Sequence, residues 1–131
     1  MELLKKTAAL AACSLLIAAV SAIAQAGEKS MSKNAYRGSD RAALEKKIAA
    51  AYTDRYSTDT VLKVVITQSG WQAVKKVENG VKITNHLISA EVAVDSGDKA
   101  TVWQLTFRKI GSRVELFSIG ESFSVSKAAL K

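Results

Sequence analysis

The stretch from Ile88 to Ile119 constrains the fold most, because apolar and polar residues alternate on both sides of residues 95–98 (Asp-Ser-Gly-Asp). Alternation with a period of two is typical of strands buried on one face, and the Ser-Gly pair between the two runs indicates a turn. A two-residue turn would set Asp95 opposite Asp98 and Ile88 opposite Leu105. A slip of one residue would turn half of the large apolar side chains to water, so the pattern favours one hairpin register.

Three more strands are predicted around this hairpin. Residues 60–68 and 71–77 alternate in the same way, and the Asn-Gly pair at residues 79–80 accepts the positive φ angles of a type I′ turn. Reversing turns at residues 69–70 and 79–80 would pair Ile66 with Ala73 and Trp71 with Ile88. The last loop, residues 110–112, is expected to be bulged, because a bulge would set Leu105 opposite Phe117 and keep the apolar face continuous.

A helix is predicted from Ser39, a plausible N-cap residue, to about Tyr56. Its apolar residues recur at the spacing of one helical face. They are Leu44, Ile48, Ala51, Tyr52 and Tyr56.

The order of these elements predicts an α+β fold, with one N-terminal helix packed on a curved antiparallel β-meander of four to five strands. A single domain would span residues 39–126, after a flexible leader at 27–38 and before a tail at 127–131. This architecture is similar to cystatin-like and NTF2-like domains, a likeness that implies a fold and no function. The helix is expected to cover Leu62, Val64, Ile66, Trp71, Ile88, Val92, Trp103, Leu105, Phe107, Phe117 and Ile119.

Residues 1–26 have the anatomy of a cleaved signal peptide: Lys5 and Lys6, then an apolar run, then Ala24-Gln25-Ala26. Cleavage after Ala26 is preferred, and a cut after Ala24 also satisfies the motif. The mature chain would then be periplasmic or secreted, without a membrane span. An alternative is a lipoprotein anchored through Cys13, because residues 10–13 (Leu-Ala-Ala-Cys) match a lipobox.

Removing the leader would lower the formal net charge from +7 to +6 and would remove the one cysteine of the chain. The mature part then has no thiol for a disulfide, a nucleophile or a metal site. Its carboxylates lack the spacing of a ligand loop, and no catalytic or nucleotide-binding motif is present. The sequence therefore predicts no catalytic residue, metal or cofactor.

A small pocket between helix and sheet is the one acid–base constellation that the expected registers bring together. His86 would lie on the core face near Glu115, beneath Tyr52 or Tyr56. A histidine beside a carboxylate is a combination that general acid–base chemistry uses. The alternative interpretation of His86 is a hydrogen-bonded histidine at the edge of the core.

Apolar residues on the opposite face of the sheet predict a surface for a partner. Val65, Val74, Leu87 and Leu116 would lie close together there, and a cluster of exposed apolar residues is typical of a contact surface. The basic residues form scattered pairs rather than one face with aromatic residues between them, which disfavours nucleic acid as a partner. We therefore expect a non-enzymatic binding or accessory protein of the bacterial cell envelope. Its partner would be another envelope protein or a second copy, and a small-molecule pocket is the alternative.

Overall fold

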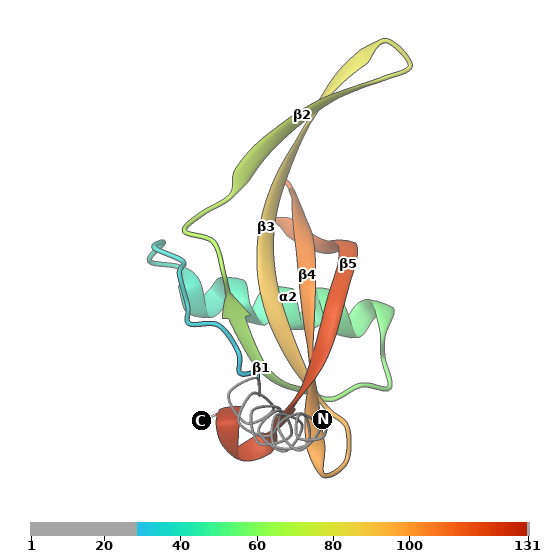
Figure 1. Cartoon of the computed structure of the whole chain (residues 1–131). Helices are drawn as coiled ribbons and strands as arrows, with labels where there is room; N and C mark the ends of the chain where they lie inside the picture. The colour runs from blue at the N-terminus through green and yellow to red at the C-terminus, as the bar shows by residue number, and fades with distance from the viewer. Residues whose placement is uncertain (1–28, 131) are drawn as a thin grey trace, which may run out of the picture.

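The computed structural model describes residues 29–130, so the expected signal peptide, its cleavage sites and Cys13 lie outside the described residues. One helix packs against an open antiparallel sheet of five strands, as Figure 1 shows, and the predicted α+β class is confirmed. The elements are α2 (Arg41–Arg55), β1 (Val61–Ile66), β2 (Gln72–Glu78), β3 (Val81–Asp95), β4 (Lys99–Ile110), β5 (Arg113–Ser126) and the 3₁₀ helix η1 (Lys127–Leu130).

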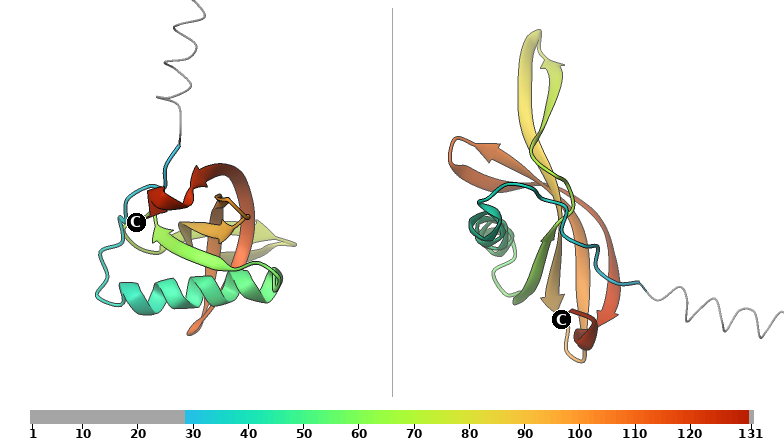
Figure 2. Two further views of the ribbon diagram at one scale, coloured as in Figure 1. Left: turned by 90° about the horizontal axis from the view of Figure 1, so that it is seen from below. Right: turned by 90° about the vertical axis from the view of Figure 1, so that its left-hand side faces the viewer.

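The helix α2 has the apolar stripe that its sequence predicts. Leu44, Ile48, Ala51 and Tyr52 are buried, whereas Tyr56 lies just beyond the last helical residue and is 36% exposed. The N-cap is Asp40 rather than Ser39. The Asp40 carboxylate does not cap the helix, because it accepts a hydrogen bond from the Tyr36 hydroxyl at 2.7 Å. The stripe turns one face of α2 toward the sheet, and the right-hand view of Figure 2 shows the helix nearly end-on beside one face of the sheet.

The strands β1 and β2 do not form the expected hairpin, and the pairing of Ile66 with Ala73 is wrong. Both strands pair with the same edge of β3, where Ile66 lies opposite Ala90 and Gln72 lies opposite Leu87. Residues 67–71 are an excursion between two halves of one interrupted strand, not a reversing turn. The Thr67 N–H donates to the Ser89 carbonyl at 3.0 Å, so the chain stays against β3 as it passes. The long β3 has room for both partners because it has 15 residues.

The Asn-Gly turn between β2 and β3 is confirmed. Asn79 and Gly80 have φ angles of 51° and 78°, which is the pair of positive values that a type I′ turn requires. Glu78 lies opposite Val81, and Gln72 lies opposite Leu87. The expected pairing of Trp71 with Ile88 belongs to this same register, although the regular ladder ends one pair before it.

The hairpin of β3 and β4 keeps the expected faces but differs by two residues in register. Asp95 lies opposite Ala100, and Ile88 lies opposite Phe107 rather than Leu105. The turn lies one residue further along the chain than expected, at Gly97-Asp98, because the Ser96 N–H donates to the Lys99 carbonyl at 2.9 Å. The Asp95 carboxylate also accepts a hydrogen bond from the Gly97 N–H at 3.0 Å. A shift of two residues leaves each side chain on its own face, since the strand period is two.

The last hairpin has a tight turn where a bulged loop was expected. Ile110 lies opposite Arg113, and Gly111 takes the positive φ of 62° that this two-residue loop needs. The irregularities lie inside the ladder instead, between Thr106 and Phe107 and between Trp103 and Leu105. The result is a register that differs by one residue at the start of β5. Leu116 lies opposite Phe107, so Leu116 turns toward the helix and Glu115 turns away from it.

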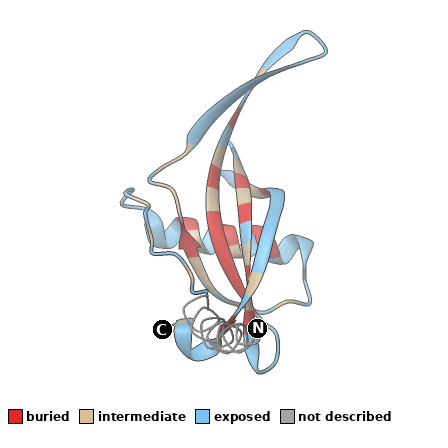
Figure 3. Cartoon of the chain, in the orientation of Figure 1, coloured by how far each residue is buried: buried red, intermediate tan, exposed pale blue. Residues whose placement is uncertain are grey.

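The core lies between α2 and the middle of β3 and β4, as the red segments in Figure 3 show. A smaller cluster on the other face of the sheet joins Val102 and Val125. The expected core is confirmed for Ile66, Ile88, Val92, Leu105 and Phe107. It is wrong for Leu62, Phe117 and Ile119, which are between 39% and 45% exposed. Phe117 is the unpaired residue at the first irregularity of β5, and Ile119 follows that irregularity opposite Leu105.

Both segments that flank the domain contact it. In the expected flexible leader, the Ala35 N–H donates to the Ile66 carbonyl at 2.8 Å, and the backbone and hydroxyl of Ser32 both donate to the buried Glu91 carboxylate at 2.8 Å. At the expected fraying tail, Lys127 forms an ion pair with Asp95 at 2.7 Å. Residues 32–37 therefore run beside β1 and add to the edge of the sheet there.

Candidate functional site

A two-stranded ribbon projects from the sheet beyond the helix and beyond the end of β4. This ribbon, residues 72–85, is called the arm, and Figure 1 shows it extending away from the rest of the domain. The ladder between β3 and β4 begins at His86, so within the described residues Val81–Asn85 have a neighbouring strand on one side and an open edge on the other. All seven residues of β2 are exposed. A lone two-stranded ribbon is marginally stable in water, and its open edges offer unpaired N–H and carbonyl groups.

The arm carries exposed valines between lysines. Val74 is 44% exposed, Val77 64% and Val81 60%. The arm has three lysines, Lys75, Lys76 and Lys82, and one acidic residue, Glu78, which forms an ion pair with Lys76 at 2.6 Å. The three lysines, Val77 and Thr84 line a shallow hollow of about 330 Å³. The arm is therefore an apolar and basic surface that the rest of the domain does not cover.

Three of the four residues expected in the partner surface, Val65, Val74 and Leu87, lie on the outer face, the side of the sheet away from α2. Leu87 is half-buried in β3 beside the base of the arm. Val65 is buried at 5% exposure, and Leu116 belongs to the core beneath the helix. The four residues do not form one exposed cluster, because the tight turn at Gly111 moves Leu116 to the other face.

The four residues of the expected pocket are also divided. Tyr52 and Tyr56 lie together, with ring centroids 5.0 Å apart. His86 is exposed at the base of the arm and lies opposite Lys109. Along β3, His86 is six residues from Val92, which pairs with Trp103 near the tyrosines, a separation of about 20 Å at ~3.3 Å per residue. The structure does not bring His86 to the tyrosines, so the expected pocket, in which His86 and Glu115 would lie beneath Tyr52 or Tyr56, is not assembled.

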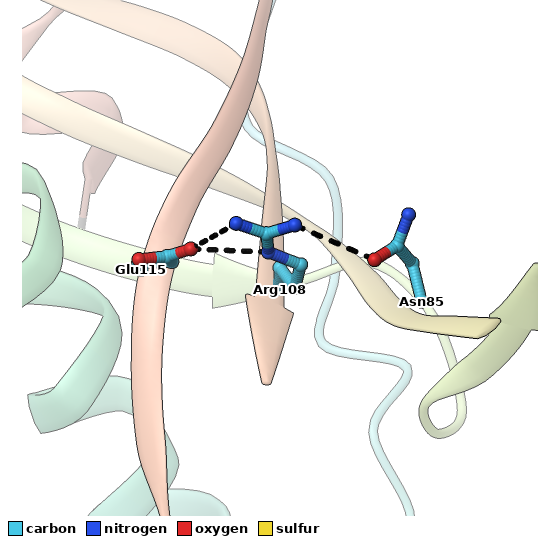
Figure 4. A network of polar contacts seen from close by, with 3 residues as sticks. All are labelled: Asn85, Arg108 and Glu115. Atoms are coloured by element: carbon cyan, nitrogen blue, oxygen red, sulfur yellow. Dashed lines mark hydrogen bonds and ion pairs between the residues drawn. The ribbon is translucent and has the colours of Figure 1, made fainter. Parts of the chain in front are cut away.

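Glu115 belongs to a polar network on the outer face (Figure 4). The Arg108 guanidinium donates to one Glu115 carboxylate oxygen through two nitrogens, Nε at 3.0 Å and a second that is closer, and to the Asn85 side-chain oxygen at 3.4 Å. The hydrogen bonds from Arg108 lower the pKa of Glu115, which keeps this carboxylate ionised and paired. Arg108 also lies 5.3 Å from the ring centroid of Phe117. The network ties β3, β4 and β5 together next to the arm.

A second pocket forms where Tyr52 and Tyr56 meet the sheet. It has a volume of about 110 Å³ and is lined by Tyr52, Tyr56, Asp59, Trp103, Leu105 and Ile119. The Tyr52 hydroxyl donates to the Asp59 carboxylate at 2.5 Å. Sequence reasoning found the tyrosines through the helical stripe and placed Trp103 beneath the helix, but it did not join Asp59 or Trp103 to the tyrosines as one site. Asp59 follows the helix by a few residues, which was the available signal, whereas Trp103 reaches the pocket through the pairing of distant strands.

A larger hollow of about 450 Å³ lies beside the leader on the outer face, between Ser32 and Gly120. Its carboxylate, Glu91, is 4% exposed and accepts two hydrogen bonds from Ser32. Among residues 29–130, no group of three or more histidine, cysteine or carboxylate side chains is placed to hold a metal ion. Within the same range, no helix has the length and apolar character needed to cross a membrane.

Comparison with known proteins returned no matching family model, no matching curated protein and no matching solved structure.

Proposed function

We propose that this chain is a small exported, non-enzymatic binding or accessory protein of the bacterial cell envelope, which acts through protein–protein contact. The observation that carries the proposal is the arm, with three exposed valines and open strand edges outside the core. Covering the arm would remove apolar surface from water and pair its backbone groups, so a partner would stabilise it. The likeness to cystatin-like and NTF2-like domains enters as an expectation about architecture alone.

The charge of the arm favours one kind of binding partner, a different protein with an acidic extended segment, over a second copy of this chain. Lys75, Lys76 and Lys82 exceed the single Glu78, so a second arm laid against the first would bring cations together. An acidic strand added to an open edge would form main-chain hydrogen bonds and neutralise the lysines. In this proposal the valines and the ladder supply affinity, and the lysines select the partner.

A photo-crosslinking residue in place of Val77 is expected to capture one acidic protein in the cells that produce the chain. The same residue in place of Lys46, which is exposed on α2, is the matched control and is expected to capture none.

With the purified partner, the double change Lys75→Glu and Lys82→Glu is expected to weaken binding about tenfold or more, because like charges across an interface repel. The control pair Lys46→Glu and Lys99→Glu carries the same change in net charge and is expected to leave the affinity unchanged. Equal capture from both positions, or equal loss in both pairs, would refute the arm as the contact surface.

Export is tested by the intact mass of the protein produced with its own leader. We expect a mature chain that begins at Gly27, or at Gln25 if the earlier site is used, recovered from the periplasm or medium. A lipid adduct on Cys13 would replace that expectation with a membrane-anchored lipoprotein. A full-length mass in the cytoplasmic fraction would contradict export.

A further inference from the structure

The pocket at the end of α2 is small, aromatic and closed by a carboxylate. Its volume of about 110 Å³ is below the ~300–1,000 Å³ of sites that enclose a whole drug-sized ligand, so it suits a compact headgroup. Tyr52, Tyr56 and Trp103 contribute three of the eight aromatic residues of the chain. Leu105 and Ile119 complete an apolar floor.

The polar groups of this pocket give it negative character. Asp59 is half-buried, and no lysine or arginine among residues 29–130 forms an ion pair with it. Burial, and then the hydrogen bond to Asp59, raise the pKa of Tyr52 far above its ordinary value, so Tyr52 stays a neutral donor. The pocket also lies at the C-terminal end of α2, where the last carbonyl groups add a partial negative charge.

Aromatic faces and a carboxylate together select one kind of ligand. The faces of tryptophan and tyrosine rings attract cations through their quadrupole, and this attraction favours large, weakly hydrated cations such as quaternary ammonium groups. The Tyr52 and Tyr56 ring centroids lie 5.0 Å apart with the ring planes tilted by 33°, so the two rings pack against each other where both line the pocket. An anionic ligand would face the Asp59 charge, and a metal ion would have a single carboxylate as its ligand there.

We propose that this pocket binds a quaternary ammonium group, with Tyr56 and Trp103 against its methyl groups and Asp59 supplying the opposite charge. The site goes beyond the proposed partner contact and is independent of the arm. The same headgroup occurs on free choline-like molecules and on choline lipids, and the experiment separates these two sources.

Titration with choline is expected to change the fluorescence of Trp103 saturably. The protein is the mature chain carrying Trp71→Phe, because Trp71 lies outside the pocket with Lys109 5.1 Å from its ring and would add a second signal. The matched probe is 3,3-dimethylbutan-1-ol, which has the shape of choline and no charge. We expect the alcohol to bind about tenfold more weakly or worse, because cation–π attraction and the Asp59 charge are both lost. Equal binding of the two probes, or no saturable change with choline, would overturn the proposal.

Two variants locate the binding. Asp59→Asn keeps an oxygen that accepts the Tyr52 hydroxyl and removes the charge, so choline affinity is expected to fall about tenfold while the fold is retained. Asp54→Asn is the control, because Asp54 is exposed on the same helix and does not line the pocket. An equal effect of the two changes would show that net charge, not this site, governs binding, and would overturn the assignment.

Vesicles identify the source of the headgroup. Sedimentation with phosphatidylcholine vesicles that choline inhibits, and that Asp59→Asn weakens, would assign the lipid headgroup. Binding of choline without sedimentation would assign a free ligand. Phosphatidylglycerol vesicles control for attraction of the basic chain to an anionic surface. Sedimentation with either lipid that choline does not inhibit, together with no response of Trp103 to choline, would overturn the proposal.

Discussion

Replacing Phe107 with alanine is expected to lower the free energy of unfolding by about 3–5 kcal/mol. Its side chain is fully buried, and Ile88 and Leu116 lie opposite it on the two neighbouring strands. The loss combines the transfer of an aromatic ring to water with the cavity that remains between sheet and helix. Because a domain of this size has ~5–15 kcal/mol of stability in total, urea unfolding should show a much lower midpoint with an unchanged slope.

Phe117→Ala is the matched control for Phe107→Ala. The sequence predicted both phenylalanines on the buried face, but Phe117 is 40% exposed and lies over Arg108 on the outer face. Its loss removes a cation–π contact worth about 0.5–1 kcal/mol, together with a modest apolar area. Equal destabilisation by the two changes would contradict the register at the start of β5.

The alternation of residues predicted which strands exist, and for most of them which face is buried, because a period of two specifies a face directly. It could not specify register where a shift of two residues preserves the faces. The turn between β3 and β4 shows this limit, since the hydrogen bonds from Gly97 and Ser96 centre it on Gly97-Asp98, one residue later than expected, and Ile88 then lies opposite Phe107. The turn at Asn79-Gly80 was predicted correctly, because asparagine and glycine accept the positive φ angles of this turn whatever surrounds them.

Two other errors came from turns whose direction depends on distant contacts. Residues 69–70 were interpreted as a reversal, yet the chain continues along β3 because the Thr67 N–H finds the Ser89 carbonyl. At Gly111 the turn is tight and the irregularities lie further along β5, which exchanges the faces of Glu115 and Leu116. One residue of register therefore removed Glu115 from the expected pocket and Leu116 from the expected partner surface.

The candidate sites were predictable to the extent that they are local. Tyr52 and Tyr56 share a helical stripe, so the sequence placed them together, and Asp59 is close enough in the chain to join them. The alternation of its strand placed Trp103 beneath the helix, but its position beside the tyrosines depends on the register of the strands, which the sequence did not specify. The arm was missed because its exposure depends on where β4 stops: Ile110 ends that strand before it can cover Val81–Asn85.

Gly120→Ala is expected to destabilise the protein by about 1–3 kcal/mol, the cost of forcing a methyl group into a packed site. Gly120 lies at the second irregularity of the last ladder, between the pair of Leu105 with Ile119 and the pair of Trp103 with Ser122. A Cβ atom there would lie 2.8 Å from the backbone carbonyl oxygen of Gln104. Backbone cannot turn aside as the end of a side chain can, so the two strands would have to separate locally.

Gly70→Ala makes the same chemical change where there is room. A Cβ atom at Gly70 would meet nothing within 4 Å, and Gly70 does not have a positive φ angle. Alanine at such a position reduces the freedom of the unfolded chain, so the expected change is neutral or a stabilisation of up to about 1 kcal/mol. Comparing the urea midpoints of the two variants then shows whether the loss of stability comes from the close approach of two strands at Gly120 or from replacing any glycine with alanine. Equal midpoints for the two variants would mean that Gly120 does not face the Gln104 carbonyl, and the irregularity in β5 would have to lie elsewhere.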